Sequence, residues 1–283
     1  MTKIATKPML AHKFDEARID FKDFTYMQPK LDGVRCLFTK DGAFSRAGKQ
    51  FMNVRHIEES LKDYFEQNPA MVLDGELYNH DLKDDFEKII SLVRKQKPTD
   101  ENRSEARRMI QYHVYDYKDL ECKSGEGLPY RVRQNMLTCS DIYCPSIHYT
   151  ETRRAATPAM IKVLHQKFLD QGYEGSIIRL NGPYEQKRSK NLLKVKDFSD
   201  SEAKIIDFVE GKGKRKGTIG KFIAVDSLGM QFGMPVMDNF KYLQENFNKM
   251  KKWVGKTATF KYFEKTKRGS YRHPLFKCLR NYE

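Results

Sequence analysis

Just after a run of strand-forming residues, the chain carries the stretch Lys30-Leu31-Asp32-Gly33-Val34-Arg35, which places an amine, a carboxylate and a guanidinium around one glycine. A lysine attacks only as the free amine, and since its ordinary pKa is about 10.4, nearby cations or burial must lower that pKa. Gly33 permits close backbone approach to a ligand, Asp32 can bind a metal or a hydroxyl, and Arg35 offers a planar fork to phosphate oxygens. The stretch predicts nucleotide capture on Lys30. The alternative is a plain hairpin, because Asp-Gly often marks a turn between strands.

The residues around this stretch predict a first domain, 1–198, that mixes helices with mostly antiparallel strands. Residues 26–39 are rich in strand formers, and the Asp41-Gly42 turn leads into a second strand, which together predict a β-hairpin. Apolar spacing predicts helices over 54–68, 83–96 and 161–169, and strands over 71–78, 112–117, 176–179 and 192–196.

A polar run at 197–201 predicts a boundary, and the remaining residues, 199–283, predict a small β domain. Strands are expected over 203–209, 218–227, 256–263 and 275–279, with one helix over 239–250. Short strands with one inserted helix are typical of a five-stranded OB-fold barrel. The expected fold class is therefore α+β, with a β-barrel domain at the end, in whose interior Trp253 is expected to pack.

The charge balance predicts a polyanionic partner. The chain of 283 residues has 52 Lys and Arg against 38 Asp and Glu, a formal net charge of +14. Residues 199–283 hold 18 basic and 9 acidic residues, so the excess per residue is greater there. A nucleic acid is the natural partner for such a surface. The alternative is a surface charge that only maintains solubility.

The cysteines and the apolar residues exclude several classes of protein. The five cysteines form no Cys-x-x-Cys pair and no histidine stands at zinc-finger spacing, which argues against disulfides and structural zinc. No stretch of about 18 apolar residues occurs, and residues 1–11 lack the apolar core of a signal peptide. We therefore expect a soluble protein in a reducing compartment.

Five further short stretches follow the lysine in order. They are Ser45-Arg46-Ala47-Gly48, Leu73-Asp74-Gly75-Glu76-Leu77, Val114-Tyr115-Asp116-Tyr117, Glu174-Gly175-Ser176-Ile177-Ile178-Arg179 and Leu193-Lys194-Val195-Lys196. With the first stretch they resemble the motifs of the nucleotidyltransferase superfamily, which contains ATP-dependent DNA ligases, RNA ligases and mRNA capping enzymes. The resemblance runs from about residue 26 to the C-terminus and implies a nucleotidyltransferase (adenylation) domain followed by an OB-fold.

The resemblance implies a role for each matching residue. Lys30 becomes the nucleophile that is bonded to AMP, and Arg46 grips the 5′-phosphate of the nucleic acid. Glu76 binds the ribose hydroxyls, Tyr115 stacks on the base, and Glu174 serves the metal.

The other implied roles concern phosphate and the third step of the reaction. Lys194 and Lys196 contact phosphate, and Asp32, Arg35, Arg46 and a metal align the 3′-hydroxyl. Two residues apart on a predicted strand, the two lysines face the same side, so both can balance a triphosphate and lower the pKa of the Lys30 amine.

Each of these residues also has a plainer interpretation. The lysine pair could lie on a solvated strand face, Tyr115 in the core, and Arg46 at the surface. Glu76 and Glu174 could be ordinary loop carboxylates. The ordered occurrence of six stretches favours the functional interpretation over all of these.

The C-terminal domain offers two further features. The loop Gly211–Gly217 alternates glycine with Lys212, Lys214, Arg215 and Lys216, which suits contact with backbone phosphates, although a disordered charged turn has the same composition. Residues 272–276 and Arg280 resemble the tail of small virus-type and bacterial-type DNA ligases. The widespread Arg-x-Asp-Lys form is absent, so Arg272, Lys277 and Arg280 all stay open as the residue that orients pyrophosphate.

These features together predict a minimal ATP-dependent DNA ligase that uses ATP and Mg²⁺, acts on nicked duplex DNA, binds no membrane, and works as a monomer in the cytoplasm of a bacterium or of a virus-infected host cell. A capping guanylyltransferase and an RNA ligase are the enzymatic alternatives, although RNA ligases usually carry Asn at the position of Arg35. A basic nucleic-acid-binding protein without catalysis is the third alternative, against which the intact Lys30, Glu174, Lys194 and Lys196 argue.

Overall fold

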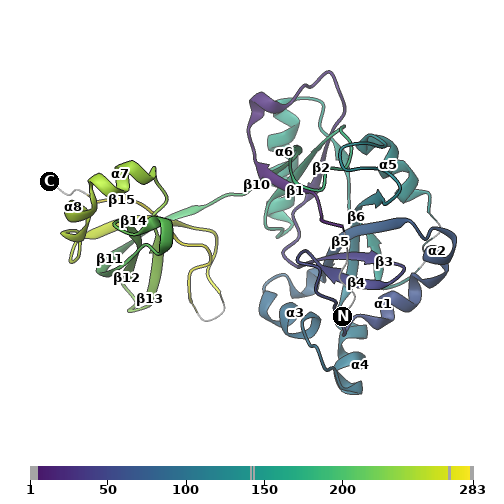
Figure 1. Ribbon diagram of the computed structural model, residues 1–283, viewed down its shortest axis with the longest axis horizontal. Helices are drawn as coiled ribbons and strands as arrows, with labels where there is room; N and C mark the ends of the chain where they lie inside the picture. The colour runs from purple at the N-terminus through teal and green to yellow at the C-terminus, as the bar shows by residue number, and fades with distance from the viewer. Residues whose placement is uncertain (1–5, 141, 143, 267–268, 281–283) are drawn as a thin grey trace. The chain divides into compact units, whose positions relative to one another are not determined.

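The computed structural model describes residues 6–140, 142, 144–266 and 269–280, and the chain divides into two compact units, 1–195 and 196–283 (Figure 1). The division falls three residues before the boundary predicted at 198. Each unit has its own apolar core.

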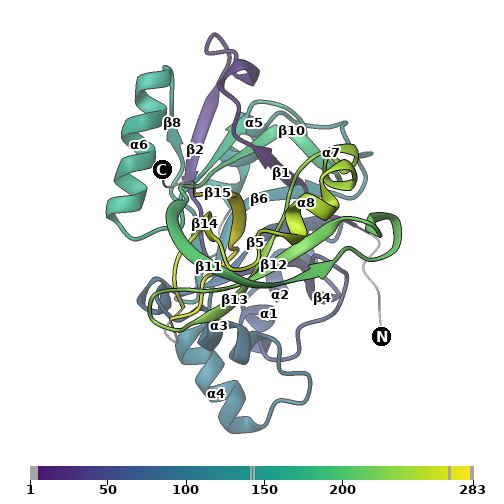
Figure 2. The same ribbon diagram turned by 90° about the vertical axis from the view of Figure 1, so that its left-hand side faces the viewer.

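One sheet of the first unit has the order β1-β10-β9-β2-β8. A single parallel pair, β1 with β10, stands beside antiparallel neighbours. Helix α6 covers one face of this sheet (Figure 2), with Phe168 packed against Met27 and Ile178. The helix begins at Pro158, where Thr157 accepts a hydrogen bond from the Met160 N–H, so it is longer than the predicted 161–169. The elements are β1 (Leu10–Lys13), β2 (Thr25–Pro29), β8 (Arg153–Arg154), α6 (Pro158–Asp170), β9 (Ser176–Leu180) and β10 (Arg188–Val195).

The other sheet of the first unit has the order β4-β3-β5-β6-β7, with one parallel pair, β6 with β7. Its core lies against helices α1 to α4, and the β3–β4 turn at Asp41-Gly42 confirms the hairpin predicted there. The elements are β3 (Val34–Thr39), β4 (Gly42–Ser45), α1 (Arg55–Ser60), α2 (Lys62–Gln67), β5 (Met71–Tyr78), α3 (Phe86–Val93), α4 (Asp100–Met109), β6 (Gln111–Asp119), α5 (Tyr130–Thr138) and β7 (Ile147–Tyr149).

The lysine stretch joins the two sheets of the first unit. Strand β2, which ends at Pro29, belongs to one sheet, and β3, which begins at Val34, belongs to the other. The two strands do not pair, so the plain hairpin considered for Lys30–Arg35 is wrong. Gly33 is required at this crossing, because a Cβ there would lie 2.4 Å from the Leu77 carbonyl oxygen.

The second unit is a five-stranded antiparallel sheet in the order β13-β12-β11-β14-β15, as predicted for the barrel. The helix expected over 239–250 is two short helices, because the chain breaks at Asn246. Trp253 stacks on Phe276 at 5.7 Å between ring centroids and packs against the core, as expected. The elements are β11 (Ser199–Glu210), β12 (Ile219–Val225), β13 (Gln231–Pro235), α7 (Phe240–Glu245), α8 (Phe247–Lys251), β14 (Thr257–Tyr262) and β15 (Leu275–Leu279).

Across the part of the chain that the structure describes, no helix combines the length and the apolar character needed to cross a membrane.

Candidate active site

Lys30 and Glu174 are brought together by an extension of the β2–β9 ladder. The Lys30 N–H donates to the Gly175 carbonyl at 2.9 Å, and the Glu174 N–H donates to the Lys30 carbonyl at 3.2 Å. The Lys30 ammonium forms an ion pair with the Glu174 carboxylate. The Glu174 side chain is only 3% exposed and that of Lys30 20%, so a desolvated carboxylate faces a partly accessible amine.

Glu76 and Tyr115 lie on neighbouring strands, β5 and β6, of the second sheet. The Tyr115 hydroxyl donates to the Glu76 carboxylate at 3.3 Å. Burial raises the pKa of Glu76 to about 7, against the opposing effect of Lys30 and Arg35. The Glu76 carboxylate therefore changes charge near neutral pH in the ligand-free protein.

Arg35 is held by a buried carboxylate. Its Nε and Nη2 donate to the two oxygens of Asp74 at 2.9 and 2.5 Å, and the Tyr184 hydroxyl donates to Asp74 at 2.6 Å. This bidentate pair fixes the plane of the guanidinium, which also lies 5.5 Å from the centre of the Tyr115 ring. Arg35 is thus oriented by the fold before any ligand arrives.

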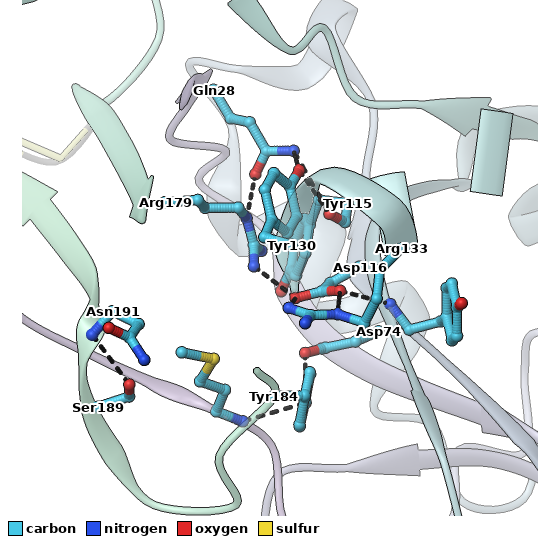
Figure 3. A network of polar contacts seen from close by, with 12 residues as sticks. Gln28, Asp74, Tyr115, Asp116, Tyr130, Arg133, Arg179, Tyr184, Ser189 and Asn191 are labelled. Atoms are coloured by element: carbon cyan, nitrogen blue, oxygen red, sulfur yellow. Dashed lines mark hydrogen bonds and ion pairs between the residues drawn. The ribbon is translucent and has the colours of Figure 1, made fainter. Parts of the chain in front are cut away.

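A second buried network joins the two sheets behind Tyr115 (Figure 3). Asp116 on β6 accepts from Arg179 on β9 at 2.7 Å and from Arg133 on α5 at 2.8 and 3.1 Å. Gln28 on β2 accepts from the Arg179 Nε at 2.6 Å. The Arg179 guanidinium lies 5.1 Å from the centre of the Tyr115 ring, so the ring lies close to two cations, Arg35 and Arg179.

Lys194 on β10 is part of a positive cluster in the first unit. Burial lowers the pKa of Lys194, and the neighbouring charges of Arg188, Lys30 and Arg46 lower it further. Arg46 lies in the tight turn that follows β4 and is exposed. The cluster therefore brings Lys30, Lys194 and Arg46 within electrostatic reach of one another.

Lys196 does not share the strand predicted for it. Strand β10 ends at Val195, and Lys196 belongs to the second unit, where its ammonium lies 4.7 Å from the centre of the Phe263 ring. The strand periodicity that would have placed Lys194 and Lys196 on the same side is therefore interrupted after Val195.

Among the described residues, no group of three or more His, Cys, Asp and Glu side chains could hold a metal ion. Mg²⁺ needs only one or two protein carboxylates when substrate phosphates supply the other oxygens. The Glu174 carboxylate beside Lys30 fits that requirement. Asp32 is half-buried. Burial raises the pKa of the Tyr78 hydroxyl, and the charges of Tyr173 and Asp32 add to that effect.

The predicted residues of the second unit lie in two places. The four cations of the loop between β11 and β12 are all exposed, and the loop is closed by hydrogen bonds from Gly211 to the Thr218 carbonyl and from Gly217 to the Glu210 carboxylate. Near the C-terminus each candidate pairs with an acidic residue: Arg272 with Glu264, Lys277 with Asp200 and Arg280 with Glu202.

Six residues that hold the predicted ones in place had no role predicted from the sequence: Gln28, Asp74, Asp116, Arg133, Arg179 and Tyr184. A signal was present for two of them, since Asp74 follows the apolar pair Val72-Leu73 and Asp116 stands between Tyr115 and Tyr117, and a buried carboxylate needs a cationic partner. Which arginines supply that partner depends on how the two sheets pack.

Comparison with known proteins gives consistent matches. Residues 8–196 match the model of the family described as ATP dependent DNA ligase domain. A DNA ligase of African swine fever virus is 30% identical over 212 residues, covering 68% of this chain and 46% of the viral protein. A DNA ligase of Haemophilus influenzae is 26% identical, covering 75% of this chain and 71% of the bacterial protein.

A solved structure supports the assignment of both folds. It comes from a study titled "DNA binding with a minimal scaffold: Structure-function analysis of Lig E DNA ligases" and covers 98% of this chain and 100% of its own, with a TM-score of 0.77 and 22% identity. The predicted nucleotidyltransferase domain followed by an OB-fold is thereby confirmed. The chain spans about half the length of the viral relatives it matches.

Proposed function

Because this chain belongs to the family of ATP-dependent DNA ligases, we propose that it seals nicks between a 5′-phosphate and a 3′-hydroxyl in duplex DNA through a lysyl-AMP intermediate on Lys30. We assign nucleotide transfer to residues 1–198 and an OB-fold domain to residues 199–283. One observation carries the proposal: the Lys30 amine pairs with the buried Glu174 carboxylate within reach of the Lys194 charge.

The first step forms a bond between the Lys30 Nζ and the α-phosphorus of ATP. The bond from that phosphorus to the bridging oxygen breaks, and pyrophosphate leaves. Lys30 must lose a proton to solvent before it attacks. The neighbouring charge of Lys194 favours that loss, and the ion pair with Glu174 holds the amine in place. Lys194 and, as expected from the sequence, Lys196 balance the charge of the triphosphate.

The nucleotide is bound by the residues around the Lys30 amine. Tyr115 stacks on the adenine, and Glu76 accepts hydrogen bonds from the ribose hydroxyls. The contact of Tyr115 with Glu76 at 3.3 Å supports this arrangement, because the two groups must serve neighbouring parts of one ligand. The network behind Tyr115 keeps its ring in position.

The second and third steps act on DNA. AMP passes from Lys30 to the 5′-phosphate at the nick, which Arg46 binds. The 3′-hydroxyl then attacks that phosphate and AMP leaves, with Arg35 and Asp32 aligning the groups. Arg35 is suited to alignment because Asp74 fixes its plane.

Mg²⁺ is proposed as the cofactor of these steps. Glu174 would hold it, with Asp32 as a second carboxylate and phosphate oxygens completing the shell. When bound, Mg²⁺ neutralises charge that develops on the phosphates.

Covalent labelling tests the proposal. We expect purified protein with Mg²⁺ to take label from α-labelled ATP and to pass it on when nicked duplex is added, with sealed DNA as the product. Lys30→Ala should abolish the labelling, whereas the matched control Lys22→Ala, an exposed lysine of the same unit, should keep it.

Three results would contradict the proposal. Label retained in Lys30→Ala would remove Lys30 from its assigned role. Label from GTP in place of ATP would point to a capping guanylyltransferase. Absence of label from both nucleotides would favour a nucleic-acid-binding protein without catalysis.

A further inference from the structure

A cavity of about 430 Å³ in the first unit opens beside the lysine stretch and is lined by basic side chains that include two outside all six motifs. Gly33, Arg35 and Arg46 line it from the motifs. Lys49 and Arg94 line it as well, and none of the lining residues is acidic. The cavity is therefore continuous with the residues proposed for the reaction.

Arg94 is held at the cavity by a buried helix. It caps the C-terminus of α3, where its N–H donates to the Ile90 carbonyl at 3.0 Å, and the two residues before it, Leu92 and Val93, are in the core. The chain after it is tied to the neighbouring hairpin by a hydrogen bond from Gln96 to the Gln50 carbonyl at 3.4 Å. The base of the Arg94 side chain is thus fixed while its guanidinium is exposed.

Lys49 is positioned by the turn after β4. The Ser45 N–H donates to the Lys49 carbonyl at 2.8 Å, and the Lys49 N–H donates to the Ser45 hydroxyl at 3.0 Å. Gly48, at φ 79°, makes the turn possible. The turn presents Arg46 and Lys49 to the same cavity.

The cavity has an excess of positive charge. Arg35 is neutralised by Asp74. Within the ranges that the structure describes, Arg46, Lys49 and Arg94 form no ion pair with a carboxylate. Three like charges facing one space repel each other, and an anion that enters it relieves that repulsion.

We propose that Arg94 and Lys49 bind a backbone phosphate of the DNA strand next to the 5′-phosphate assigned to Arg46. The inference rests on the proposed function, since it extends the site of Arg46 along the same strand. The guanidinium of Arg94 suits two phosphate oxygens, and the ammonium of Lys49 adds a point charge. DNA is favoured over ATP as the source of the phosphate because the proposed function assigns the triphosphate to Lys194, beside Lys30.

The test uses the full chain, with nicked duplex as substrate at several salt concentrations. For R94Q we expect the KM for nicked duplex to rise about fivefold with little change in kcat, and the slope of log affinity against log salt to fall by about 0.9, since one phosphate is no longer neutralised. K49Q should likewise raise the KM for nicked duplex and reduce the salt slope. The matched control is K95Q, which removes the same charge from an exposed neighbour that does not line the cavity.

R94K separates charge from geometry and guards against a folding defect in R94Q. R94K should have the wild-type salt slope, and its KM for nicked duplex should lie between the KM of wild type and that of R94Q. An unchanged KM and slope in R94Q, or an equal change in K95Q, would overturn the proposal. It would also be overturned if R94Q raised the KM for ATP in lysyl-AMP formation and left the KM for DNA unchanged, because the cavity would then hold the triphosphate. If wild-type protein formed no lysyl-AMP, the proposed function itself would fail instead.

Discussion

Asp116 faces two guanidinium groups in the interior of the first unit, with side-chain exposures of 0% for Asp116 and 4% for Arg133 and Arg179. Burial alone would raise the pKa of Asp116, but the two arginines outweigh it and hold the pKa below its ordinary value. The charge of this carboxylate therefore stabilises the folded protein above about pH 4, and that contribution is lost as the pH falls through the lowered pKa.

Asp116→Asn leaves two buried cations without their counter-charge. We expect it to lower the free energy of unfolding by about 3–5 kcal/mol at pH 7, measured by urea denaturation. The matched control is Glu59→Gln, which breaks exposed pairs with Arg55 and Arg107 and should cost less than about 1 kcal/mol. Similar losses in the two variants would contradict the role given to Asp116.

The pKa of Glu76 is shifted in the opposite direction to that of Asp116, so its effect on stability has the opposite pH dependence. Since its pKa is raised to about 7 in the folded protein, its stabilising contribution is complete below the ordinary value near 4.5 and is lost as the pH rises through 7. Glu76→Gln removes this dependence. The stability of Glu76→Gln relative to wild type should therefore improve between pH 5 and pH 8, by on the order of 2 kcal/mol.

Urea denaturation of the ligand-free protein at four pH values checks this expectation. The comparison between variants cancels the titration of all other groups. A difference in stability that is constant from pH 5 to pH 8 would show that Glu76 has an ordinary pKa.

At the scale of elements, the site depends on strands that end or begin at functional residues. β2 ends just before Lys30 and β9 begins just after Glu174, and the ladder between them continues through both residues. A strand pattern in the sequence predicts each of these strands, whereas their pairing follows from the sheet topology. The placement of Glu174 beside Lys30 was accordingly implied only by resemblance.

The loop between β11 and β12 is the element of the second unit with the most concentrated charge. We expect that replacing Lys212, Lys214, Arg215 and Lys216 by Gln reduces the slope of log affinity for nicked duplex against log salt, by about 0.9 for each phosphate that the loop neutralises in the wild-type protein. A filter-binding titration at several salt concentrations measures the slope.

The control for this loop variant removes four charges from exposed lysines elsewhere, Lys7, Lys22, Lys62 and Lys123. The salt slope of this control variant should be closer to the wild-type slope than that of the loop variant is. Equal slopes in the loop variant and wild type would return the loop to the alternative of a solvated charged turn.

Over the whole molecule, the sequence predicted the features that repeat along the chain better than those that depend on tertiary contacts. The strand patterns predicted the small barrel, the mixture of helices and antiparallel strands in the first unit, and the hairpin at Asp41-Gly42, whereas the nucleotidyltransferase fold was implied by resemblance. Helix α4 was missed because it is polar, with only Ala106 buried, and its start is marked by a Thr99–Asn102 capping box rather than by apolar spacing.

Two further differences between the predicted and the observed elements have the same kind of cause. The helix predicted over 54–68 is interrupted at Leu61, where the apolar spacing continues but the backbone leaves the helical region. Lys196 falls beyond the strand that holds Lys194, because the chain leaves the first unit there. Neither a break within an apolar pattern nor the limit of a compact unit has a clear signal in the spacing of side chains.

The crossing of Lys30–Gly33 between two sheets has a consequence for how the first unit responds to its ligand. The backbone of Lys30 is bonded to one sheet, while Arg35, Glu76 and Tyr115 belong to the other. In the proposed arrangement, a nucleotide held by both sets of residues would link the two sheets, which the buried contact of Asp116 with Arg179 also joins. We therefore expect nucleotide binding to raise the stability of the whole first unit and not only to order the residues around the Lys30 amine.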